Sequence, residues 1–68
     1  LLESFFRLTK AGFSQKRKTL RNALAGGLGW TTAKTGDLLN IAGIDPFRRA
    51  ESLSLDEWHA LTLAFSPH

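Results

Sequence analysis

The sequence has no cysteine and no long run of apolar residues. Without cysteine it can form neither a disulfide nor a thiolate metal site, so packing alone must stabilise the fold. A membrane-spanning helix would need about 18 consecutive apolar residues, and the first residues are too acidic and amphipathic for a signal peptide. We therefore expect a cytoplasmic protein with no membrane partner.

The chain is also short. Its 68 residues allow one small domain, which would bury only about 60% of the surface that the unfolded chain exposes. The first residue is Leu rather than Met, so we expect a piece excised from a longer protein. We expect this domain to be a monomer.

Positive charge is concentrated near the start of the chain. Residues 1–24 carry six Lys or Arg against one Glu, whereas residues 25–68 carry three against five acidic residues. Such a cationic segment favours a polyanionic partner. The alternative is a solvated basic face that binds nothing.

The hydrophobic pattern predicts an all-α fold, because no alternating β-branched run occurs. We expect a small orthogonal bundle of about four helices, with a short helical turn that begins at Asp45-Pro46. The expected helices cover residues 2–12, 14–25, 32–42 and 55–65.

The first helix carries apolar side chains at helical spacing. They are Leu2, Phe5, Phe6, Thr9 and Phe13. We expect this stripe to face the core rather than to stack on nucleobases, since three phenylalanines at such spacing are typical of a buried helix face.

The second helix is expected to have one apolar and one cationic face. Ser14 is a candidate N-cap, and Gly26-Gly27 is a candidate stop. The cationic face would carry Arg17, Lys18, Arg21 and Asn22. The glycines do not indicate a phosphate-binding loop, because the GxxxxGK[ST] and GxGxxG spacings are missing and a helix C-terminus repels anions.

Two pairings are expected in the second half of the chain. Ser54 and Glu57 have the spacing of a capping box, in which each side chain bonds the backbone amide of the other residue. Arg49 and Glu51 are close enough along the chain for a partly buried structural ion pair. We prefer this pairing to a catalytic role for the carboxylate.

No residue pattern suggests catalysis. His59 and His68 are the only imidazoles, and they do not make a metal site. No nucleophile is paired by spacing with a His and a carboxylate. We therefore expect a binding module with no catalytic residue, metal or cofactor of its own.

Four segments taken together resemble one family. They are Phe5-Phe6, residues 11–22, Gly43 to Pro46, and Arg49 to Glu57. In this order and spacing they resemble the C-terminal domain of the ribosomal RNA adenine dimethyltransferases, the family of KsgA and the erythromycin-resistance enzymes. The Gly43 to Pro46 segment favours the KsgA branch, while residues 26–35 match poorly.

The resemblance implies a role within a larger enzyme. Family members join a Rossmann-like domain, which binds S-adenosylmethionine and dimethylates N6 of adenine, to a small helical domain that helps to engage the RNA. In the KsgA branch the target is small-subunit ribosomal RNA during ribosome assembly. The family's cofactor and catalytic motifs have no counterpart in this sequence. We therefore expect this chain alone neither to bind the cofactor nor to methylate.

The implied RNA-binding residues are the cationic and amide side chains of the first third: Arg7, Lys10, Lys16, Arg17, Lys18, Arg21 and Asn22. They would contact phosphates, which position an RNA without reading its sequence. In a second interpretation, Arg17, Lys18 and Asn22 hold the catalytic domain of the same parent chain. A third is an unrelated helical interaction or DNA-binding module. We expect the connection between the second and third helices to be longer than the three- or four-residue turn of a helix-turn-helix motif.

Overall fold

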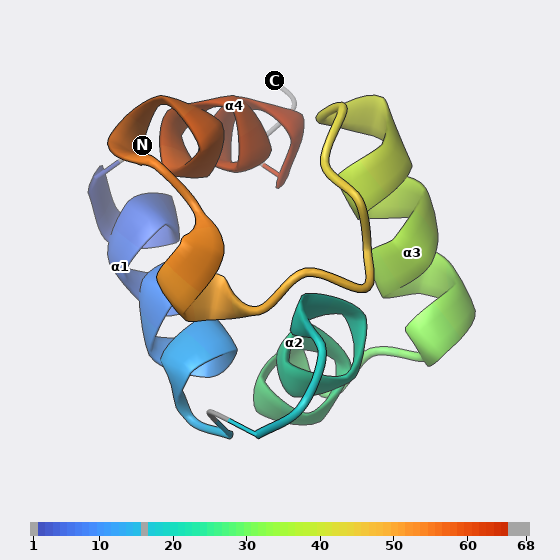
Figure 1. Cartoon of the computed structure of the whole chain (residues 1–68). Coiled ribbons are helices and arrows are strands. Elements are labelled where there is room, and N and C mark those ends of the chain that lie inside the picture. Colours follow the sequence, from blue (N-terminus) through green and yellow to red (C-terminus); the bar gives the residue numbers. More distant parts are fainter. Residues whose placement is uncertain (1, 16, 66–68) are drawn as a thin grey trace.

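The structure is a computed structural model that describes residues 2–15 and 17–65. These residues form four α-helices and one 3₁₀ turn, and no strand: α1 (Leu2–Phe13), α2 (Leu20–Leu28), α3 (Thr32–Ile41), η1 (Ala50–Ser52) and α4 (Leu55–Phe65). The predicted all-α fold is confirmed. Figure 1 shows the helices arranged around a centre that the segment between α3 and α4 crosses, with η1 beside α1.

The core draws on every helix and on the crossing segment. Its buried members are Leu8, Ala11, Leu20, Leu24, Leu38, Leu39, Ile44, Ala50, Trp58 and Leu61. Leu38 and Leu39 from α3, together with Ile44 just after it, bring the crossing segment into this cluster. Burial of these apolar side chains is the main stabilising contribution, at about 25 cal/mol per Å² removed from water.

The prediction of which side of α1 faces the core was wrong for Leu2 and Phe6, whereas Phe5 does pack against the core. Leu8, Ala11 and Gly12 are buried, whereas Leu2 is 68% exposed and Phe6 is 60% exposed. At about 100° per residue, the centre of the buried side lies roughly a third of a turn from the centre of the apolar stripe predicted to face inward. Apolar residues therefore occupy two sides of this helix, and the core uses mainly one of them, with Phe5 packed at its edge.

Small residues explain the orientation of α1. A Cβ atom added to Gly27 of α2 would lie 2.5 Å from the Ala11 Cβ, and one added to Gly12 would lie 2.8 Å from the ring of Trp58. The neighbouring elements therefore approach α1 too closely for large side chains at these contacts. Close packing at Ala11 and Gly12 leaves Leu2 and Phe6 exposed, while Phe5 still packs against the core.

The second helix begins at Leu20, six residues later than predicted. Its N-cap is Thr19, whose side chain accepts a hydrogen bond from the Asn22 amide at 3.4 Å. Ser14 is not an N-cap, because its hydroxyl donates to the Ala11 carbonyl at 2.6 Å at the end of α1. The connection to α2 therefore occupies residues 14–19.

The end of α2 also differs from the prediction. The helix continues through Gly26 and Gly27, and Gly29 ends it with a left-handed backbone (φ 71°) that glycine adopts without strain. Only residues 29–31 separate α2 from α3. The expected longer connection was wrong, so connection length is no argument against a helix-turn-helix motif. However, α3 carries only Lys34 and Asp37 as charged residues, which does not suit a helix in an anionic groove.

The start of α4 follows the prediction. The Ser54 amide donates to Glu57 Oε1 at 2.9 Å, and the Glu57 amide donates to Ser54 Oγ at 3.2 Å, so the capping box is confirmed. Asp45 accepts a bond from the Phe47 amide at 2.9 Å, but residues 45–48 form only a turn. The short helical element is η1, further along the chain.

Candidate nucleic-acid interface

The start of α2 lies against the segment that follows α3. The Leu20 amide donates to the Arg48 carbonyl at 2.6 Å, and the Arg21 amide donates to the Pro46 carbonyl at 3.1 Å. These bonds bring together two polar segments that are far apart in sequence. We call their cationic and amide side chains the basic junction: Arg17, Lys18, Arg21, Asn22 and Arg49.

Arg17 and Lys18 project from the connection before α2 rather than from a helix. Both are exposed, and neither lies in a helix because α2 begins at Leu20. The predicted cationic helix face is therefore a cationic loop followed by one helical turn. Lys16, predicted to bind RNA, lies outside the described residues.

Arg21 is the most constrained cation of the basic junction. Its guanidinium carbon lies 5.4 Å from the centroid of the Phe47 ring, a distance at which a cation is attracted to an aromatic face. The Phe47 ring is 65% exposed. The Arg21 Nε atom is buried and has no hydrogen-bond partner among the described residues. Phe47 thus orients a guanidinium whose Nε atom is out of reach of a ligand in solvent.

The backbone at the start of α2 is not free to bind an anion. The Leu20 and Arg21 amides are bonded to carbonyls of the crossing segment, and the Asn22 amide is bonded to Thr19. A helix N-terminus binds phosphate through such amides when they are unsatisfied. Any anion at the basic junction must therefore be held by side chains.

The ion pair among the described residues differs from the expected one. Arg48 pairs with Glu57, whereas Arg49 and Glu51 are both exposed and form no ion pair. Pairing with Glu57 raises the pKa of Arg48. The charge of Arg48 is thus neutralised, and that of Arg49 is left facing solvent at the basic junction.

The other predicted RNA-binding residues lie on α1. The Arg7 guanidinium lies over the ring of Phe65, 5.7 Å from its centroid, at the contact with α4. Lys10 is exposed in the last turn of α1. Neither belongs to the segments that the backbone bonds bring together.

Conversely, sequence reasoning missed Phe47, for which no local signal exists because its partner Arg21 lies 26 positions earlier.

The described residues contain no group of three or more His, Cys, Asp or Glu side chains placed to hold a metal ion. Of the two histidines, His59 is exposed on α4, and His68 lies outside the described residues. No helix within the described part of the chain is long and apolar enough to cross a membrane.

The structure is a small all-α unit in which backbone hydrogen bonds join the segment after α3 to the start of α2. No family model matches the chain. It is 56% identical over 62 residues to the ribosomal RNA small subunit methyltransferase A of Desulfitobacterium hafniense, and equally identical over 62 residues to the protein of that name from Dehalococcoides mccartyi. The protein of that name from Syntrophotalea carbinolica is 54% identical over 65 residues.

These matches cover 91% to 94% of this chain but only 21% to 24% of each relative. The chain thus spans about a fifth to a quarter of the length of the curated relatives, and it corresponds to their C-terminal region. The resemblance inferred from the sequence is confirmed.

Proposed function

We propose that this chain is the RNA-docking domain of a small-subunit ribosomal RNA adenine dimethyltransferase, and that the basic junction contacts phosphates of that RNA. The parent enzyme would bind S-adenosylmethionine in a separate catalytic domain and act in ribosome assembly in the cytoplasm. One observation carries the proposal: two backbone hydrogen bonds from Leu20 and Arg21 bring the crossing segment, with Arg49, against the segment that carries Arg17 and Lys18.

The composition of the junction suits phosphate contact. Arg17, Lys18 and Arg49 are exposed, whereas Arg21 lies against the Phe47 ring with its Nε atom buried. Arginine binds phosphate oxygens through a planar fork, and lysine binds them as a point charge. Each phosphate neutralised should add about 0.7 to 0.9 to the slope of log K against log salt concentration. The curated relatives are named as methyltransferases of small-subunit ribosomal RNA. We therefore propose this RNA as the polyanionic partner.

The test compares Lys18→Ala with Lys34→Ala in the full-length parent protein. Each change removes one positive charge, but the Lys34 ammonium lies over the Trp30 ring, 4.1 Å from its centroid, on α3. We expect Lys18→Ala to weaken binding to a 3′-terminal fragment of small-subunit ribosomal RNA and to lower the salt slope by about 0.7 to 0.9. Lys34→Ala should change neither.

A double variant, Arg17→Ala with Lys18→Ala, should roughly double the loss of slope if both side chains contact phosphates. Unchanged affinity in this variant would contradict the RNA role and favour contact with the catalytic domain of the parent. An equal loss on an unrelated hairpin would reduce the junction to a nonspecific anchor. Urea unfolding of each variant checks that the fold is retained.

A further inference from the structure

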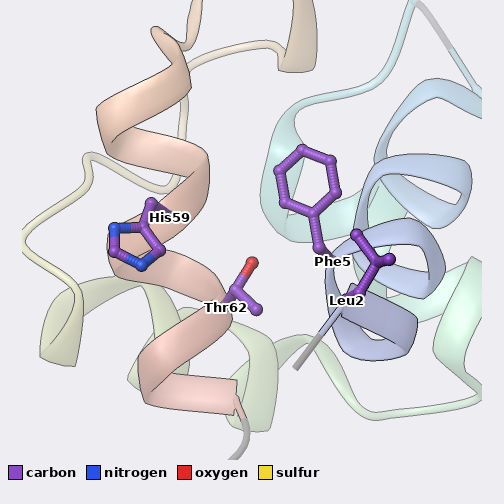
Figure 2. A pocket seen from close by; sticks show the side chains of 4 residues that line it. All are labelled: Leu2, Phe5, His59 and Thr62. Carbon is purple, nitrogen blue, oxygen red and sulfur yellow. The ribbon is translucent and has the colours of Figure 1, made fainter.

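An apolar groove runs between α1 and α4, away from the basic junction. Leu2 and Phe5 of α1 face His59 and Thr62 of α4 across a cavity of about 370 Å³ (Figure 2). The rings of Phe5 and His59 and the alkyl groups of Leu2 and Thr62 line it. Among residues 2–15 and 17–65, no Lys, Arg, Asp or Glu contributes to this lining.

Exposed apolar side chains flank the groove on both helices. On α4, Leu55 is 74% exposed and Leu63 is 48% exposed, and both fall near His59 at spacings of four residues. On α1, Leu2 and Phe6 are exposed by more than half. We call these residues and the groove between them the α1/α4 apolar surface. Contiguous apolar surface of this kind is uncommon on a small monomer unless it is covered.

The length of the relatives indicates what covers this surface. The match occupies only 22% of the Desulfitobacterium hafniense protein and lies in its C-terminal region. In a protein of that organisation, most of the chain precedes α1 and enters at its first turn. Leu2, in that turn, lines the groove. The preceding part is therefore tethered beside the α1/α4 apolar surface at a high effective concentration.

We propose that the part of the parent protein that precedes α1 packs against the α1/α4 apolar surface. Apolar side chains would hold the two parts together. The part of the lining that the structure describes carries no Lys or Arg with which to neutralise phosphates, so RNA does not suit it. This inference goes beyond the proposed RNA contact, and it rests on the part of the proposed function that makes this chain one domain of a longer protein. It also assigns the contact between domains to a surface other than the basic junction.

The test measures maleimide labelling of single cysteines in the full-length parent protein, with any cysteine outside this chain replaced by serine. The labelling rate of Leu63→Cys reports whether the α1/α4 apolar surface is covered. Ala33→Cys is the control, because Ala33 is exposed on α3 and lines neither the groove nor the basic junction. Each labelling rate is divided by the rate for the same variant unfolded in urea, which removes differences in intrinsic reactivity.

We expect Leu63→Cys to react at least about tenfold more slowly than Ala33→Cys, since a covered site reacts only when it opens. The protection should not change with protein concentration or with added ribosomal RNA fragment. Equal rates at the two positions would overturn the proposal. Protection that grows with protein concentration would assign the surface to a second copy, and protection that requires RNA would assign it to the RNA; either result also overturns it.

A charge substitution provides a second readout. Leu63→Glu should loosen the packing in the full-length protein and speed proteolytic cleavage before α1, whereas Ala33→Glu should not. Leu63 is half exposed in the domain itself, so the charge should leave α4 folded, which amide exchange of α4 verifies. Unchanged cleavage with α4 intact would contradict the inference. Neither readout depends on whether Lys18 contacts RNA, so the two proposals can fail separately.

Discussion

Arg48 and Glu57 form a salt bridge that ties the segment after α3 to the first turn of α4. The Arg48 Nη2 atom donates to Glu57 Oε1 at 3.0 Å and also bonds the Ser52 carbonyl. The same Glu57 oxygen accepts the Ser54 amide at 2.9 Å in the capping box. One carboxylate thus caps a helix and holds the residue whose carbonyl receives the Leu20 amide at the basic junction.

The first prediction concerns acid stability. The hydrogen bond from Arg48, followed by that from the Ser54 amide, lowers the pKa of Glu57 from 4.5 to about 2. Between these values the unfolded chain binds more protons at this position than the folded chain does. The stabilising contribution is therefore complete above pH 4.5 and is lost as the pH falls towards 2.

Glu57→Gln should remove this contribution. Thermal unfolding is measured at a series of pH values from neutral down to about 2. As the pH falls from 4.5 to about 2, Tm should fall less for the variant than for the natural chain. All other carboxylates are common to both proteins, so the difference between the two curves isolates Glu57. Parallel curves would show that the salt bridge does not affect the acid stability.

The second prediction separates two adjacent arginines. Arg48→Ala leaves Glu57 without its partner and should lower the unfolding midpoint in urea. Arg49→Ala removes an exposed side chain and should leave that midpoint nearly unchanged. If the proposed function is right, Arg49→Ala should also lower the salt slope of RNA binding by about 0.7 to 0.9. Loss of stability in both variants would argue against the division of roles.

The third prediction concerns the close approach of α1 and α2. A Cβ at position 27 would lie 2.7 Å from the Ala11 Cα, which is backbone and cannot turn aside. Gly27→Ala should therefore destabilise the chain by about 1–2 kcal/mol through overpacking. Gly26→Ala is the matched control, because its Cβ would meet only the Gln15 side chain at 3.5 Å.

In the control, better helix propensity should stabilise the chain by about 0.5 kcal/mol. Urea unfolding of both variants measures the difference. A stabilising effect of Gly27→Ala, equal to that of Gly26→Ala, would mean that the helices separate at little cost.

The fourth prediction concerns a buried hydroxyl. Thr35 of α3 is fully buried, and its hydroxyl donates to the Arg21 carbonyl of α2 at 2.9 Å. Thr35→Val retains the shape of the side chain and should cost about 1 kcal/mol, the typical net value of such a bond. Thr9→Val removes a hydroxyl that bonds only the Phe6 carbonyl of its own helix, and it should change stability by less than about 0.5 kcal/mol.

Urea unfolding again provides the measurement for this pair. Equal effects of Thr35→Val and Thr9→Val would show that the bond between α3 and α2 adds nothing beyond a local one. Amide exchange at Arg21 and its neighbours would then be expected to stay unchanged in the Thr35 variant.

Local sequence was sufficient wherever the interacting groups are neighbours along the chain. The all-α class follows from periodicity, and the capping box of Ser54 and Glu57 follows from a spacing of three residues. The gathering of positive charge in the first third is likewise a property of composition. None of these depends on which elements pack together.

Tertiary contacts decided the remaining features. The buried side of α1 depends on the fit of Ala11 against Gly27, and the late start of α2 is accompanied by bonds from its first amides to Arg48 and Pro46. The choice of Glu57 as the partner of Arg48 likewise joins residues nine positions apart. Periodicity identified α1 as amphipathic, but it could not choose between its two apolar sides, because that choice depends on how closely another helix approaches.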